Sequence, residues 1–216
     1  MRSPYQRHLP HQIPEKFPIF LTWNLKGAMP RKIWQMLQRE RARLERLPPM
    51  NGETPGERKI REDKIIFALS DRELDCANDG PMHLKDSAAA KIVEDSILFG
   101  VPERYDLLAW CVMANHVHVL LTPHWELEDT THGIKGYTAL QINNLQNARG
   151  RVFWQDESYD HWARDDEEMM RIIAYIESNP VVAGLCLTPE AWPWSSARFR
   201  KNWLLGEPFV KSTSGL

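Results

Sequence analysis

The stretch Trp110-Cys111-Val112-Met113-Ala114-Asn115-His116-Val117-His118-Val119-Leu120-Leu121-Thr122-Pro123 holds two short apolar runs separated by Ala114-Asn115. Apolar runs of this length between turn residues are typical of buried strands, so the stretch predicts a β-hairpin. Residues two apart on a strand point to one face, so His116 and His118 should project together while Val117 and Val119 face the core. Two adjacent imidazoles can hold a divalent metal, or they can lie on the surface of a half-buried sheet. The hairpin alone leaves both interpretations open.

The composition is that of an ordinary globular protein, with 216 residues, 43% hydrophobic and 26% charged. No apolar run has membrane-spanning length, and the start of the chain lacks a signal-peptide pattern. The three cysteines are far apart and form no CxxC pair, so we expect reduced thiols in a cytoplasmic protein. The formal charge of −2 argues weakly against nucleic-acid binding, although a basic patch can exist within a neutral total.

The rest of the chain predicts strands and helices around the hairpin, after an extended lead-in at residues 1–16. The order indicates one α+β domain close to a ferredoxin-like arrangement, an antiparallel sheet with helices packed on one face. A helical insertion at residues 31–82 should lie over this domain. The predicted elements are the strand Phe17–Leu25, the insertion helices Arg31–Arg46 and Glu57–Asp75, the helices Ala88–Phe99 and Thr131–Asn147, and the strand Ser158–Arg164.

A last helix should open at Asp165, which caps it, and should end before Pro180. Residues 181–216 then read as a tail that packs aromatic side chains back on the domain. At 100° per residue, Tyr175 and Asn179 lie one turn apart at the edge of the buried stripe, with Glu168 near them. Taken alone, such a tyrosine is an amphipathic core residue; beside two metal-binding histidines it is a candidate nucleophile.

Taken together, these motifs resemble those of the REP-associated tyrosine transposases. This family is a branch of the HUH single-strand DNA nucleases and is related to the single-tyrosine transposases of small insertion sequences. The resemblance covers most of residues 5–200. The segments that carry it are Phe17–Leu25, Trp110–Pro123, Ile134–Asn143, Phe153–Arg164, Arg171–Leu185 and Trp192–Ala197.

The resemblance implies that His116 and His118, with Asn179, hold Mg²⁺ or Mn²⁺, and that Tyr175 is the nucleophile. It also implies a single-stranded DNA endonuclease and transposase that forms a 5′-phosphotyrosine and acts on palindromic hairpin DNA. Where the family commonly has proline before the asparagine and histidines, this chain has Ala114, which leaves the rigidity of the turn open. Tyr159 is a rival nucleophile, and a monomer is expected although a dimer stays open.

Further candidates follow from their positions in the sequence. Three residues are expected beside the metal ligands, and four are expected to contact DNA through cationic groups or an aromatic ring. Two other functions remain open, namely a non-catalytic binder of DNA hairpins and a zinc hydrolase that uses His116, His118 and His124. The candidates beside the metal are Asp160, His161 and Glu168, and those for DNA are Lys135, Arg149, Arg151 and Trp154.

Overall fold

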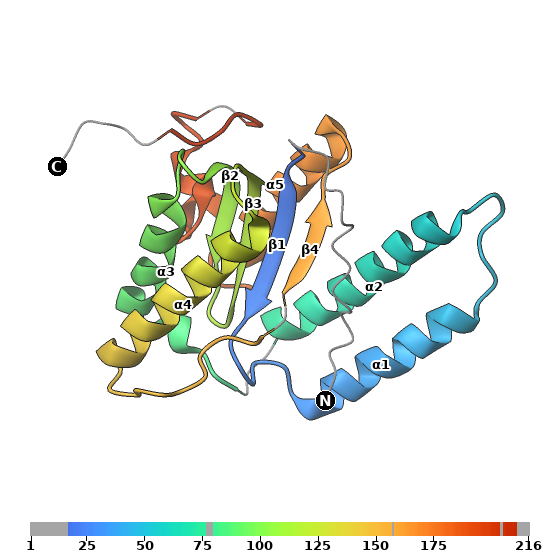
Figure 1. Ribbon diagram of the computed structural model, residues 1–216, viewed down its shortest axis with the longest axis horizontal. Helices are drawn as coiled ribbons and strands as arrows, with labels where there is room; N and C mark the ends of the chain where they lie inside the picture. The colour runs from blue at the N-terminus through green and yellow to red at the C-terminus, as the bar shows by residue number, and fades with distance from the viewer. Residues whose placement is uncertain (1–16, 77–79, 157, 204, 211–216) are drawn as a thin grey trace.

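The computed structural model describes residues 17–76, 80–156, 158–203 and 205–210 (Figure 1). The expected lead-in at residues 1–16 lies outside these ranges. A four-stranded antiparallel sheet forms the centre of the molecule, with strand order β2-β3-β1-β4. The strands are β1 (Ile19–Asn24), β2 (Tyr105–Val112), β3 (His116–Pro123) and β4 (Tyr159–Trp162).

Two helices connect the strands in the ferredoxin-like manner. Helix α3 (Ser87–Phe99) precedes β2, and α4 (Leu127–Leu145) leads from β3 to β4. This βαββαβ order with β1 at the centre confirms the predicted α+β class. The helical insertion after the first strand is also present, as α1 (Arg31–Arg46) and α2 (Pro55–Asp75), and α5 (Asp166–Val182) follows β4.

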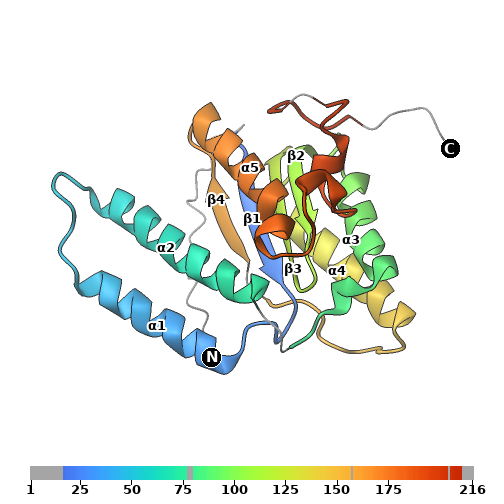
Figure 2. The same cartoon turned by 180° about the vertical axis from the view of Figure 1, so that it is seen from behind.

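The helices lie on both faces of the sheet. As predicted, α3 and α4 cover one face, but α5 lies on the opposite face, where Phe67 of α2 joins it (Figures 1 and 2). Both sides of β3 are therefore buried. Val117 and Val119 face α3 and α4, whereas His116 and His118 are fully buried on the α5 side. Among the helices in the described ranges, none combines the length and apolar character needed to cross a bilayer.

Helix boundaries follow local capping chemistry. The side chain of Asp165 accepts a hydrogen bond from the Glu168 backbone N–H, which confirms the predicted cap of α5. The predicted end of this helix is wrong, because α5 continues through Pro180 to Val182. Proline removes one backbone donor, but the next turn closes through Ala183 N–H to Asn179 and Leu185 N–H to Pro180.

Several of the described residues after α5 pack on β2 and bind its outer edge. Val112 N–H donates to the Trp194 carbonyl at 2.8 Å, and Phe209 N–H donates to Leu107 at 2.7 Å. The fully buried Trp110 ring contacts three aromatic rings of this segment. Those rings belong to Phe199, Trp203 and Phe209.

Gly100 offers a test of this packing. It ends α3, and a Cβ added there would lie 2.4 Å from the Tyr105 ring, which is buried and held through its hydroxyl by Ile97. We expect Gly100→Ala to lower the free energy of unfolding by about 1–3 kcal/mol, because the ring cannot move aside. The measurement is urea unfolding. Gly136→Ala is the control, because a Cβ added there meets nothing within 4 Å and should not destabilise the protein. An equal decrease in the free energy of unfolding in both variants would contradict the prediction.

Candidate metal centre

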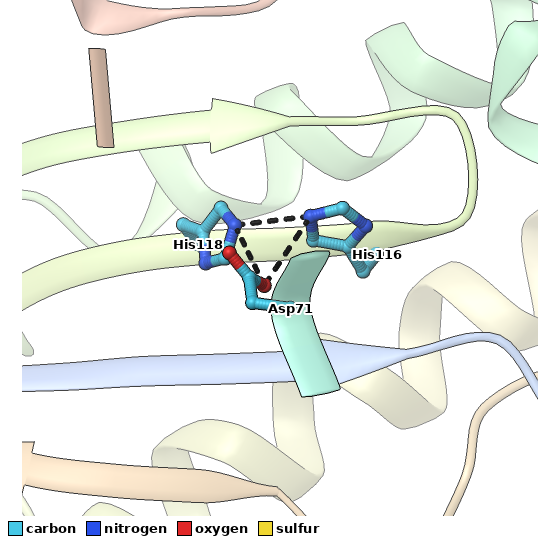
Figure 3. A group of neighbouring side chains, drawn as sticks. All are labelled: Asp71, His116 and His118. Atoms are coloured by element: carbon cyan, nitrogen blue, oxygen red, sulfur yellow. Dashed lines mark hydrogen bonds and ion pairs between the residues drawn. The ribbon is translucent and has the colours of Figure 1, made fainter. Parts of the chain in front are cut away.

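The two histidines of the hairpin converge as predicted. Their Nε2 atoms lie 3.0 Å apart at the start of β3, and neither side chain is exposed to solvent (Figure 3). Burial lowers the pKa of each imidazole to about 3. Both rings are therefore neutral at physiological pH, which is the form that binds metals.

The outer nitrogen of each ring is held by a polar side chain. Asn115 Nδ2 donates to the Leu74 carbonyl at 2.9 Å, so its Oδ1 accepts from His116 Nδ1 at 2.7 Å. His116 thus carries its proton on Nδ1 and has a lone pair on Nε2. The Thr22 hydroxyl lies 2.7 Å from His118 Nδ1 and can serve as donor or acceptor. Such outer partners orient metal-binding histidines in proteins.

Asp71 of α2 completes the cluster. Its Oδ1 lies 3.7 Å from His116 Nε2 and 3.5 Å from His118 Nε2. This oxygen is buried without a hydrogen-bond partner, although an unpaired buried carboxylate oxygen is costly. Two imidazole nitrogens and a carboxylate oxygen, all within 4.8 Å of one another, form a donor set that could hold a divalent metal (Figure 3).

Tyr175 and Asn179 meet the same carboxylate. The Tyr175 hydroxyl donates to Asp71 Oδ2, and Asn179 Nδ2 donates to that atom at 3.2 Å. The Tyr175 ring centroid lies 5.8 Å from that of His118, and the side chain is 37% exposed, whereas both histidines are covered. Asn179 Oδ1 is buried and lacks a partner. The fold therefore brings Tyr175 and Asn179 together with the two histidines.

Burial and negative charge act on the acidic groups of the cluster. Burial raises the pKa of Asp71, and burial together with the Asp71 charge raises the pKa of Tyr175. The phenol therefore stays protonated unless a group accepts its proton. The Asp71 carboxylate is hydrogen-bonded to that proton and is a stronger base than an exposed aspartate.

Asp75, one turn beyond Asp71, gives a pH-dependent prediction. Burial, reinforced by the Asp71 charge, raises its pKa from 3.8 to about 8. The folded state then holds a proton that the unfolded chain has lost, so metal-free stability should fall as the pH rises from about 4 to about 8. Asp75→Asn should flatten this fall, because an amide does not ionise. Melting temperatures in chelator across a pH series test it, with exposed Asp95→Asn as control; parallel curves for wild type and Asp75→Asn would contradict it.

The residues expected beside the ligands lie elsewhere. Glu168 binds Lys64 Nζ at 2.5 Å and His161 Nε2 at 3.0 Å, so these residues form a separate cluster near the start of α5. Burial opposes ionisation of Glu168, but the bonds from Lys64, His161 and Arg164 leave its pKa lowered. Asp160 pairs with Leu21 in the sheet and so lies on the opposite face from His118. The prediction that Asp160 neighbours the metal ligands is wrong. Alternate residues of a strand point to opposite faces of the sheet, and Asp160 points to the face away from His118.

The DNA-contact candidates are mostly engaged within the fold. Trp154 is only 5% exposed and its indole N–H binds Thr138, so it is a core residue and the prediction of a stacking surface there is wrong. Lys135 Nζ donates to the carbonyls of Gln155 and Asp156. Arg151 binds Asn143 and Gln146, whereas Arg149 is exposed. These residues belong to α4 and the segment after it, on the other side of the sheet from α5 (Figures 1 and 2).

The two rival assignments do not fit this geometry. His124 follows β3 at the end away from His116 and pairs with Asp106 at 3.2 Å, so the three-histidine zinc set does not form. Tyr159 is 8% exposed and stacks on Phe67 with centroids 4.1 Å apart. It is a core residue.

Asp71 is the site residue that the sequence did not reveal. The insertion was expected to lie over the domain, but its second helix supplies this carboxylate. A signal was present, because Asp71, Glu73 and Asp75 lie at the C-terminal end of α2. Acidic side chains are unfavourable there because the C-terminal end of a helix carries the negative end of its dipole. A cation near that end would offset the unfavourable placement.

Comparison with known proteins gives two matches in sequence. Residues 101–179 match the model of a family described as "Transposase IS200 like". A Haemophilus influenzae protein, whose name assigns it provisionally to the REP-associated tyrosine transposases, is 27% identical over 105 residues. The match covers 43% of this chain and 58% of that protein, little more than half of its length. The resemblance to these transposases is thus confirmed.

A solved structure is similar in backbone. It is a REP-associated tyrosine transposase bound to a REP hairpin, with 16% sequence identity and a TM-score of 0.48, covering 100% of this chain and 95% of that chain. The family match includes His116, His118, Tyr175 and Asn179 but not Asp71.

Proposed function

We propose that this chain is a REP-associated tyrosine transposase, a metal-dependent nuclease that cleaves single-stranded DNA beside a palindromic hairpin and rejoins strands. The observation that carries the proposal is the position of the Tyr175 hydroxyl. It donates to one oxygen of Asp71, whose other oxygen lies within 3.7 Å of both histidine Nε2 atoms. A nucleophile, a base and a metal-binding set thereby occupy one site.

The residues present fit a divalent ion. His116, His118 and Asp71 Oδ1 would hold it, and the unpaired Asn179 Oδ1 is available as a further oxygen ligand. When bound, such an ion would polarise the scissile phosphate and offset its negative charge. Oxygen ligands suit both Mg²⁺ and Mn²⁺, and the two imidazoles favour Mn²⁺ of the two.

Tyr175 performs the chemical step. Its Oη attacks the phosphorus of the scissile phosphate, the Oη–P bond forms, and the bond from phosphorus to the 3′-oxygen breaks. The phenol proton passes to Asp71 Oδ2, which already accepts its hydrogen bond, and the 3′-oxygen takes a proton from solvent. The products are a 5′-phosphotyrosine and a free 3′-hydroxyl.

The same residues support strand transfer. A 3′-hydroxyl from a second strand attacks the phosphorus of the phosphotyrosine and loses its proton to solvent. The new O–P bond forms as the Oη–P bond breaks, and the protonated Asp71 returns its proton to Tyr175. The energy of the phosphodiester is kept in the covalent bond, so neither water nor ATP is required. Helix α5 brings Tyr175 to histidines of its own chain, which supports a site that is complete within a monomer.

A labelling experiment tests the proposal. Single-stranded DNA that contains a hairpin and its flanks is labelled at the 3′ end, because a 5′-phosphotyrosine retains the downstream fragment. With Mn²⁺ we expect a labelled protein band on denaturing gels, and with 5′-labelled DNA a shorter free strand. Chelator should remove both products. Tight hairpin binding without either product would contradict the proposal and favour the non-catalytic binder.

A further inference from the structure

The outer face of α1 carries a row of exposed basic side chains. At 100° per residue, five exposed residues fall within an arc of about 80°, opposite the buried Leu37 and Leu44. We call this row the α1 cationic stripe. Its members are Lys32, Gln35, Arg39, Arg43 and Arg46.

Ion pairing distinguishes this stripe from most of the basic residues of α2. Arg58, Arg61 and Lys64 of α2 are each paired with a glutamate at 2.5–2.7 Å. In the stripe, Arg43 pairs with Glu40, whereas the other three cations have no acidic partner in the described part of the chain. Helix α1 has six lysines and arginines against two glutamates, so it is strongly basic in a chain whose net charge is −2.

The stripe begins level with the metal centre. Arg41 binds Asp63 at 2.7 Å, and Arg58 donates to the Leu44 carbonyl at 3.1 Å, so α1 and α2 run antiparallel. Continuing this register places Lys32 level with Asp71 and Arg46 near the start of α2. The fourteen helical steps from Lys32 to Arg46 span about 21 Å. The α1–α2 arm projects from the sheet, so the stripe runs outward from the site (Figure 2).

The chemistry of the stripe fits a phosphate backbone. Proteins that hold single strands stack bases on aromatic rings, and the stripe has none. A straight row of cations and an amide donor instead matches sequence-independent contacts to duplex phosphates. We propose that the α1 cationic stripe binds the phosphates of the double-stranded stem of a DNA hairpin, while the single-stranded flank reaches Tyr175. This inference rests on the proposed function.

Binding at varied salt concentration tests it. The double variant Arg39→Gln/Arg46→Gln is compared with Lys85→Gln/Lys91→Gln. This control removes two exposed cations outside the stripe, Lys85 before α3 and Lys91 within it, the latter paired with Asp95. The probes are a fluorescent DNA hairpin with a single-stranded flank and an unstructured strand of equal length, followed by anisotropy across a NaCl series. On the hairpin, the stripe variant should reduce the slope of log K against log salt by about 1.8, since each phosphate contact contributes about 0.9. The control should match wild type.

An unchanged hairpin slope in the stripe variant would overturn the inference. An equal reduction of the salt slope on the hairpin and on the single strand would also overturn it, because the stripe would then attract any polyanion. Adduct formation with Mn²⁺ is measured separately on the same hairpin. Failure of wild type to form an adduct refutes the proposed function, whereas an intact adduct with an unchanged salt slope refutes only the stem contact.

Discussion

Tyr175→Phe is expected to lower formation of the covalent protein–DNA adduct by at least about 1,000-fold, because the variant lacks the attacking oxygen. The ring contacts to Phe20 and Phe67 remain, so the protein should stay folded. His116, His118 and Asp71 are untouched, so Mn²⁺ affinity should change little. The measurement is the rate of adduct formation under single-turnover conditions, together with Mn²⁺ titration of the same preparation.

Two matched variants separate this role from a general effect of losing a hydroxyl. Tyr137→Phe alters a tyrosine that is 54% exposed on α4, and Tyr159→Phe alters the buried rival. Both should form the adduct at the wild-type rate. A Tyr175→Phe protein that still forms the adduct, or a Tyr159→Phe protein that does not, would refute the assignment of Tyr175 as nucleophile.

His118→Ala is expected to abolish stabilisation of the folded protein by Mn²⁺. A ligand that binds only the folded state at 100 times its Kd stabilises it by about 2.7 kcal/mol. Wild type should therefore melt at a higher temperature with Mn²⁺ than in chelator. Removing His118 deletes one donor of the cluster and leaves the Thr22 hydroxyl without its partner, so the two melting curves of the variant should coincide. Calorimetric titration provides an independent affinity.

His124→Ala is the control for this prediction, since His124 is paired with Asp106 outside the cluster. It should keep the full metal-dependent shift. The same titrations with Zn²⁺ and Mg²⁺ compare the ions. If His124→Ala loses the shift and His118→Ala keeps it, the cluster of His116, His118 and Asp71 is not the metal site.

Elements governed by local chemistry were predictable from the sequence. Arg31–Arg46 has the predicted bounds, because its apolar positions recur at helical spacing between Pro30 and Pro48. The hairpin and its paired histidines followed from alternation in a strand. The position of Tyr175 beside the histidines needed more than periodicity. It required the resemblance to known transposases, since no local pattern shows which face of the sheet a late helix will cover.

The remaining errors come from tertiary contacts. Asp71 is brought to the site by the docking of α2 against α5, and sequence spacing contains no direct record of a contact between residues 104 positions apart. The sequence around Trp154 favoured a surface on which DNA bases stack, but its ring packs against Trp23 in the core. Pro180 normally ends a helix, yet the bonds of the following turn carry α5 past it. In each case packing overrides a local preference.

Mapping the attachment site by mass spectrometry tests the central claim most directly. Wild-type protein is trapped on single-stranded hairpin DNA with Mn²⁺, digested with protease and nuclease, and the peptide carrying a nucleotide is fragmented. The proposed mechanism predicts a nucleoside 5′-phosphate on Tyr175, in a peptide from α5, and no modified peptide in chelator. A nucleotide on Tyr159 or another side chain, or a modified peptide that forms without metal, would contradict it.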